Sequence, residues 1–133
     1  MSWTNFIELF GEYIAAKLPL IKVYGNVDPA REWSGTSTVE FALNKQTTRT
    51  LLSGATLTLF DVTAACRCGT DRDALALAAS VKALLYDFLT MLANDDTIWS
   101  FAFDDFGITA DARGLVEGLS FYGFVDFSFN VRN

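Results

Sequence analysis

The stretch of sequence that decides the fold is TDRDALALAASVKALLYDFLTML, residues 70–92. It opens with the pattern of a capping box, because Thr70 is followed three positions later by an acid, Asp73. Behind this cap, large apolar residues recur at helical spacing and form one continuous stripe. The residues of the stripe are Leu77, Val81, Leu84, Leu85, Phe88 and Leu92. The sequence therefore predicts an amphipathic helix over 70–92, which ends at the polar residues 94–96.

Strands are predicted on both sides of this helix. Before it, residues 38–43 alternate weakly between polar and apolar types, and residues 55–68 form a second, longer strand. After it, residues 98–103 place aromatic side chains on one face, and residues 119–131 alternate over a long stretch. Such long period-two alternation is typical of an antiparallel strand with one buried face. Gly123 interrupts the buried row, which would allow a helix to approach closely or the strand to bend.

A second amphipathic helix is predicted near the start of the sequence, over residues 3–18. Ser2 or Thr4 can cap its start, and Pro19 stops it. Its apolar side is made of Trp3, Phe6, Ile7, Phe10, Ile14 and Leu18. The predicted order of elements is therefore helix, strand, strand, helix, strand, strand. We expect a single α+β domain over residues 1–133, in which two helices pack on one mainly antiparallel sheet of about four strands.

Two polar segments of the sequence are candidates for contact with a partner. The loop over residues 25–35 is rich in turn formers but contains Trp33, which is either tucked back on the core or offered to another chain. Residues 44–54 are either the end of a strand with its turn or a flexible arm that reaches a neighbour. Thr48 and Arg49 lie in this segment.

Acidic residues gather in a third segment, residues 104–114, which is predicted to be a loop because turn formers dominate it. The acidic residues considered are Asp104, Asp105 and Asp111. They form either a solvated acidic rim or a site for a divalent cation. The segment lacks the ligand spacing of a calcium loop, so we favour the rim.

Composition and charge exclude several classes of function. The chain has ten basic and sixteen acidic residues, a net charge of -6, and no cluster of Lys and Arg that could follow a phosphate backbone. It contains no His, so the commonest general base and the Ser-His and Cys-His pairs are missing. Its nine Gly are scattered and form no phosphate-binding loop. We therefore expect no enzyme activity, no cofactor and no nucleic-acid site.

The apolar content is high for a domain of this size. Hydrophobic residues make up 51% of the chain and aromatic residues 14%, with twelve Phe. These residues either enlarge the core or lie at interfaces with other chains. Charged residues interrupt the first apolar run, and the longest apolar stretches fall short of a bilayer span, so we expect neither a secretory signal nor a membrane helix.

The two cysteines, Cys66 and Cys68, lie two positions apart in a predicted strand. Their side chains should point to the same face about 7 Å apart, which is unfavourable for a bond between them. A metal site would need more ligands than the chain offers here. We therefore predict two small, buried, reduced thiols, which fits assembly in a cytoplasm.

The order of these elements resembles that of the tail terminator and tail completion proteins of long-tailed bacteriophages, including the terminator of the lambda tail. The specific points of likeness are the strand-to-helix joint Cys68-Gly69-Thr70-Asp71, the acidic segment 104–114, and the final alternating strand 119–131. The resemblance covers nearly the whole chain and is one of pattern rather than of a single motif.

The resemblance implies a structural protein of the virion that is assembled in the host cytoplasm. Proteins of this family form a hexameric ring on the head-proximal end of the tail tube, stop its growth and dock the head. The partners would be the tail tube protein and head-neck proteins, and DNA would pass through the ring without specific binding. An acidic balance suits such a lumen. In this interpretation, Trp33, Thr48 and Arg49 belong to a subunit contact or arm, and Asp104, Asp105 and Asp111 face the channel or its rim.

Two alternatives stay open at this point. A neck or head-to-tail joining protein of the same assembly would carry the same signals. A small ligand-binding or enzymatic α+β domain could instead use a pocket between sheet and helices. A ring that is stable in solution would argue against the second alternative.

Overall fold

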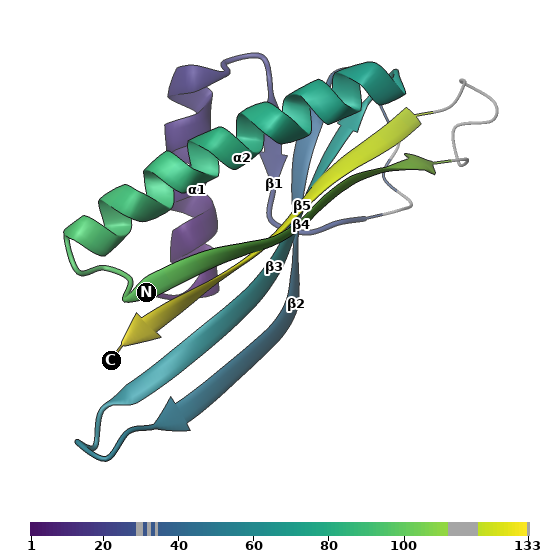
Figure 1. Ribbon diagram of the computed structural model, residues 1–133. Helices are drawn as coiled ribbons and strands as arrows, with labels where there is room; N and C mark the ends of the chain where they lie inside the picture. The colour runs from purple at the N-terminus through teal and green to yellow at the C-terminus, as the bar shows by residue number, and fades with distance from the viewer. Residues whose placement is uncertain (29–30, 32, 34, 112–119, 133) are drawn as a thin grey trace.

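A computed structural model describes residues 1–28, 31, 33, 35–111 and 120–132 of the chain. It is an α+β domain in which two helices lie on one face of a twisted five-stranded sheet (Figure 1). The elements, in chain order, are α1 (Trp3–Lys17), β1 (Lys22–Tyr24), β2 (Thr38–Thr50), β3 (Thr56–Cys68), α2 (Asp71–Asn94), β4 (Ser100–Asp111) and β5 (Ser120–Arg132). The predicted fold class and both predicted helices are therefore confirmed.

The sheet differs from the predicted one in its strand number and in the direction of one strand. Its strand order is β1-β2-β3-β5-β4, and β1 pairs with β2 in parallel, while the other three pairs are antiparallel. The sheet is thus mixed and five-stranded rather than a mainly antiparallel sheet of about four strands. The sequence analysis missed β1 because it has only three residues, Lys22–Tyr24, too few to display a period.

The predicted loop over residues 104–114 is wrong as far as Asp111, because this part of the chain is strand. The pairing of β4 with β5 shifts register between Phe103 and Asp105, which leaves Asp104 as the extra residue of a bulge. Pairing then continues to Asp111, opposite Ser120. A bulge lets turn-forming residues sit in a strand without ending the ladder, so composition alone misplaced the strand end. Residues 112–114 of the predicted loop lie outside the described residues.

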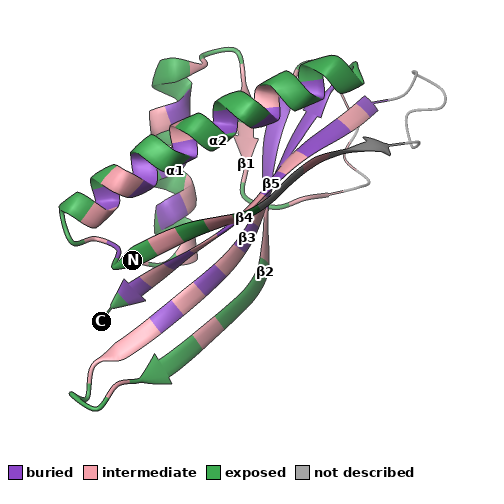
Figure 2. Ribbon diagram, in the orientation of Figure 1, coloured by how far each residue is buried: buried purple, intermediate pink, exposed green. Residues whose placement is uncertain are grey.

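Residues 44–54, for which a turn or an arm was predicted, extend the β2–β3 hairpin. The two strands pair from Thr38 opposite Arg67 out to Thr50 opposite Thr56. The turn is closed by bonds from the Leu51 N–H to the Ala55 carbonyl (2.8 Å) and from the Gly54 N–H to the Leu51 carbonyl (2.9 Å). The hairpin reaches past the rest of the sheet, and the outer part of β2 is exposed (Figure 2).

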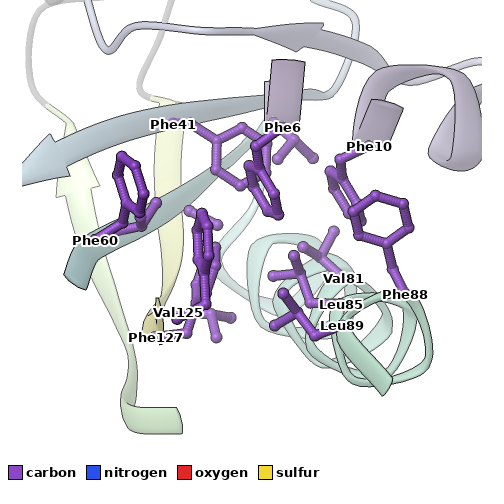
Figure 3. Packing of buried hydrophobic residues seen from close by; sticks show 14 of the residues in the cluster. Phe6, Phe10, Phe41, Phe60, Val81, Leu85, Phe88, Leu89, Val125 and Phe127 are labelled. Carbon is purple, nitrogen blue, oxygen red and sulfur yellow. The ribbon is translucent and has the colours of Figure 1, made fainter. Parts of the chain in front are cut away.

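The core lies between the helices and the sheet, and aromatic rings dominate its centre (Figure 3). Phe6 of α1 is fully buried. Its ring lies 4.6 Å from that of Phe129 and 5.8 Å from that of Phe88, measured between centroids. Further rings at about 6 Å belong to Phe10, Phe41 and Phe127. With Phe60, seven of the twelve Phe are buried in this core, as the core interpretation of the composition requires.

Helix α2 packs through a slightly different stripe from the predicted one. Thr70 is confirmed as the N-cap, because the Asp73 N–H donates to the Thr70 hydroxyl at 3.1 Å. The buried residues are Ala74, Ala78, Val81, Leu85, Phe88, Leu89 and Leu92. Leu77 and Leu84, predicted as core, are only half-buried. The buried face turns toward the alanines because Gly123 of β5 lets the helix come close, which is one of the two possibilities predicted for this glycine. A Cβ there would lie 2.3 Å from the Ala74 carbonyl oxygen.

Candidate interaction surfaces

The face of the sheet opposite the helices carries a buried ion pair that holds the segment between β1 and β2. Glu40 of β2 is fully buried, and its carboxylate accepts from the Arg31 guanidinium at 2.8 Å. The Thr38 hydroxyl donates to the second Glu40 oxygen at 3.2 Å. The Arg31 guanidinium also lies 3.8 Å from the centre of the Tyr24 ring and donates to the Asn26 side chain at 3.1 Å. These contacts compensate the burial of the carboxylate, so the cluster is a structural clamp rather than an open site.

A second arginine, Arg67 of β3, completes this clamp. Its side chain is buried, its Nε donates to the Ser120 hydroxyl at 3.0 Å, and a terminal nitrogen donates to the Arg31 carbonyl at 3.2 Å. Sequence reasoning missed Arg31, Glu40 and Arg67. A charged residue at an interior position of each of two predicted strands could have pointed to Glu40 and Arg67, whereas Arg31 lies in a loop and has no such signal.

Trp33, predicted either to tuck back or to face a partner, is tucked back. Its indole N–H donates to the Thr36 carbonyl at 2.9 Å, and its ring covers Gly69, where a Cβ would approach the ring to 3.1 Å. The Arg67 guanidinium lies 5.9 Å from the ring centre. Trp33 is half-buried and ties its loop to the joint between β3 and α2.

The same sheet face contains a shallow apolar depression of about 320 Å³. It is lined by Val27, Ala42, Asn44, Thr63, Ala65, Tyr122 and Phe124. Phe124 forms one wall, and its ring lies against Gly107 of β4, where a Cβ would come within 2.9 Å of it. Asp126 lies beside the depression and accepts a hydrogen bond from the Thr63 hydroxyl. Because its lining is mostly apolar and open to solvent, the depression suits an apolar side chain rather than a charged ligand.

The β2–β3 hairpin presents the second exposed surface. Thr48 and Arg49, predicted for a subunit contact or arm, are both exposed on its outer strand. The Thr48 hydroxyl lies 3.2 Å from that of Thr58 across the hairpin. The Leu52 side chain at the tip is completely exposed to solvent. Of the exposed large apolar side chains in the described part of the chain, Leu52 is the one most accessible to a partner. Sequence reasoning did not single out Leu52, because its position at the tip follows only from the pairing of β2 with β3.

The predicted acidic residues do not come together in a loop. Asp104 is exposed at the bulge of β4. The backbone of Asp105 lies opposite that of Asp126 in the ladder between β4 and β5, and Asp111 is the last residue of β4. They are spread along one edge strand of the sheet.

A third surface lies where α2 meets the edge strand β4. Tyr86 is 55% exposed, and its ring lies 5.6 Å from that of Phe101 and 6.4 Å from that of Phe103. Met91 and Trp99 are exposed nearby in the chain, at 48% and 55%. Aromatic residues and Met are the types that protein interfaces favour. Core packing therefore does not account for Tyr86, Met91 and Trp99.

Chemical groups for catalysis or metal binding are sparse among the described residues. Cys66 and Cys68 are free and buried, as predicted. Burial raises the pKa of both thiols above the usual range, which keeps them protonated and unreactive. In the described part of the chain, no group of three or more Cys, Asp or Glu is placed to hold a metal ion.

Helix α2 departs from one expectation drawn from the sequence. By length and composition alone, the helix Asp71–Asn94 could cross a membrane. Core helices of globular proteins meet the same criterion, and Val81, Leu85 and Leu89 are fully buried against the rest of the domain. We therefore interpret α2 as a core helix.

No protein-family model matches the sequence, and no curated protein is significantly similar to it.

Proposed function

We propose that this protein is a structural component of a bacteriophage tail that assembles into a ring on the head-proximal end of the tail tube. In that position it stops tube growth and provides the surface on which the completed head docks. The proposal combines the resemblance in element order with the surfaces described above. The observation that carries it is the projecting β2–β3 hairpin, whose tip residue Leu52 is completely exposed.

The distribution of apolar surface supports assembly with other chains. The hairpin tip, the apolar depression on the helix-free sheet face and the aromatic surface around Tyr86 lie on different parts of the domain. Subunits of a ring need two different patches, one for each neighbour, because the contact is head-to-tail. Leu52 and the aromatic residues around Tyr86 are exposed in the isolated domain and are therefore available to neighbouring subunits.

The acidic edge strand suits the channel of such a ring. In this proposal the β4 edge with Asp104, Asp105 and Asp111 faces the DNA channel or its rim, where carboxylates repel the DNA backbone and prevent it from sticking. Replacing Asp104 and Asp105 by Asn should leave the fold intact, because Asp104 is exposed and both residues lie in an edge strand. The change should affect at most DNA passage or assembly.

Electron microscopy of tails assembled with and without this protein tests the proposal. With the protein present, we expect tubes of uniform length that carry a ring at the head-proximal end. Without it, tubes should continue to grow past that length. Tubes that are uniform and capped in its absence would refute a terminator role, and density on the head portal instead of the tube end would assign the protein to the neck.

A further inference from the structure

We propose that the tip of the β2–β3 hairpin inserts Leu52 into the apolar depression on the helix-free sheet face of a second copy of this chain. This inference rests on the proposed assembly into a ring. It identifies the two surfaces that form the contact between neighbouring subunits.

The hairpin tip has the properties of a preformed apolar anchor. Leu52 is fully exposed, and the turn that holds it is fixed by the two backbone hydrogen bonds between Leu51, Gly54 and Ala55. Gly54 adopts φ +86°, a conformation that a glycine reaches without strain. Because the turn is already ordered, inserting Leu52 into a partner loses little conformational entropy.

The depression provides a matching receptor. Its volume of about 320 Å³ is at the small end of the range for ligand pockets and is ample for one leucine side chain. Val27, Ala42, Ala65 and Phe124 give it an apolar lining. Tyr122 adds an aromatic ring at its border.

The hairpin tip and the depression of one chain cannot meet. Ala42 in the depression and Thr50 near the tip lie on the same strand, β2, and eight residues of strand separate them by about 26 Å. The contact must therefore join different copies, with the tip of each in the depression of the next. A head-to-tail contact of this kind closes into a ring when the rotation between neighbours allows it.

Charge complementarity favours another copy of this chain as the occupant. Residues 44–60 contain Lys45 and Arg49 and no acidic residue, whereas the whole chain has sixteen acidic residues against ten basic ones. Asp126 lies beside the depression, where it accepts a hydrogen bond from Thr63, and the two arginines on the same sheet face, Arg31 and Arg67, are engaged with Glu40 and Ser120 in the clamp. Lys45 and Arg49 of one copy would thus approach Asp126 of its neighbour, and the opposite charges steer the two together.

Disulfide cross-linking between engineered cysteines tests this contact directly. In the full-length double variant Leu52→Cys/Ala42→Cys, mild oxidation should give a ladder of covalent oligomers that ends at the subunit number of the ring. The two new cysteines are too far apart to pair within one chain. The native Cys66 and Cys68 are buried and free, so they contribute little background. The matched control is Leu20→Cys/Ala42→Cys, because Leu20 is an exposed leucine (84%) outside the hairpin, and it should give no ladder.

Truncation of the same side chain provides a second readout that does not depend on cysteine chemistry. Leu52→Ala should weaken self-association roughly tenfold to a hundredfold, as expected for the loss of most of one buried leucine side chain. Leu20→Ala should leave self-association unchanged. Both positions are exposed, so both variants should fold like the parent protein.

The outcomes separate this inference from the proposed function. A ladder from the Leu52 pair alone supports the contact, and if tube ends then carry no ring, only the tail function is wrong. Rings on tube ends without a ladder, and with unchanged association of Leu52→Ala, overturn the hairpin contact and leave the tail function standing. A protein that forms neither ladder nor rings overturns both.

Discussion

Replacing Gly123 by Ala should destabilise the domain, because the added methyl group would collide with the backbone of α2. Gly123 lies in β5 directly under α2, and an added Cβ would lie 2.3 Å from the Ala74 carbonyl oxygen and 3.0 Å from the Ala78 Cβ. Ordinary contacts between such atoms need ~3.5 Å, so the helix would have to move back by roughly 1 Å. The first contact is with helix backbone, which cannot rotate away as a side chain can. Overpacking of this kind costs about 3 kcal/mol.

Thermal and urea unfolding of the purified variant measure this cost. For a domain of this size, about 3 kcal/mol corresponds to a fall in Tm of roughly 10 °C. The matched control is Gly11→Ala in α1, where a Cβ would meet nothing within 4 Å. There, the better helix propensity of Ala should stabilise the domain by up to about 1 kcal/mol. If the Gly123 variant were as stable as the parent protein, α2 would not pack over β5 as described, and the fold would be wrong.

Three further predictions concern the core, the clamp and the thiols. Leu85→Ala should lower the free energy of unfolding by about 2–5 kcal/mol, and Leu84→Ala by clearly less, because the Leu84 side chain is only half-buried. Equal losses would mean that both side chains are buried in the core, which would contradict the structure. Arg31→Ala leaves Glu40 buried without its cation and should lower the free energy of unfolding by about 2 kcal/mol, a value reduced because Arg31 is 22% exposed. Adding Glu40→Gln should recover part of this loss. If urea unfolding showed no loss for Arg31→Ala, the ion pair would not stabilise the fold. Burial raises the pKa of Cys66, so the unfolded chain releases this thiol proton at a lower pH than the folded chain, and the free energy of unfolding should fall as pH rises above about 8.5. Cys66→Ala should weaken this fall. Rapid reaction of Cys66 with a thiol reagent in the native protein would contradict its burial.

The helices could be predicted from the sequence because their signals are local. The Thr70 capping box and the recurring large apolar residues each specify α2 without reference to the rest of the chain. The choice of buried face was less accurate, because pattern analysis ranks large apolar residues above small ones. Ala74 and Ala78 are buried only because Gly123, on a strand 45 or more residues later, leaves room for them.

The strands were harder to predict because their limits depend on partners that are distant in sequence. β4 runs through Asp104, Asp105 and Gly107 because β5 provides a ladder for it and a bulge absorbs Asp104. Likewise, the polar residues up to Thr50 are strand because β3 pairs with them. Propensity alone assigns both segments to turns, and tertiary pairing overrides it.

The candidate surfaces were only partly visible in the sequence for a related reason. Residues 44–54 were recognised as a possible arm from their polarity, yet Leu52 gains its importance only from being at the end of a long hairpin. The depression has no sequence signature at all, because Val27, Ala42 and Phe124 come from a loop and two strands that are far apart in the sequence. Surfaces of this kind follow from topology rather than from local pattern.

The mass of the assembled protein tests the central claim, ring formation, most directly. We would measure it by sedimentation over a wide concentration range, with the full-length chain alone and with tail tubes. The account predicts one closed species that stops at a fixed number of 14.7 kDa subunits, six if the resemblance holds, in solution or on tube ends. A protein that stays monomeric at every concentration and does not bind tubes, or one that grows without limit, would contradict it.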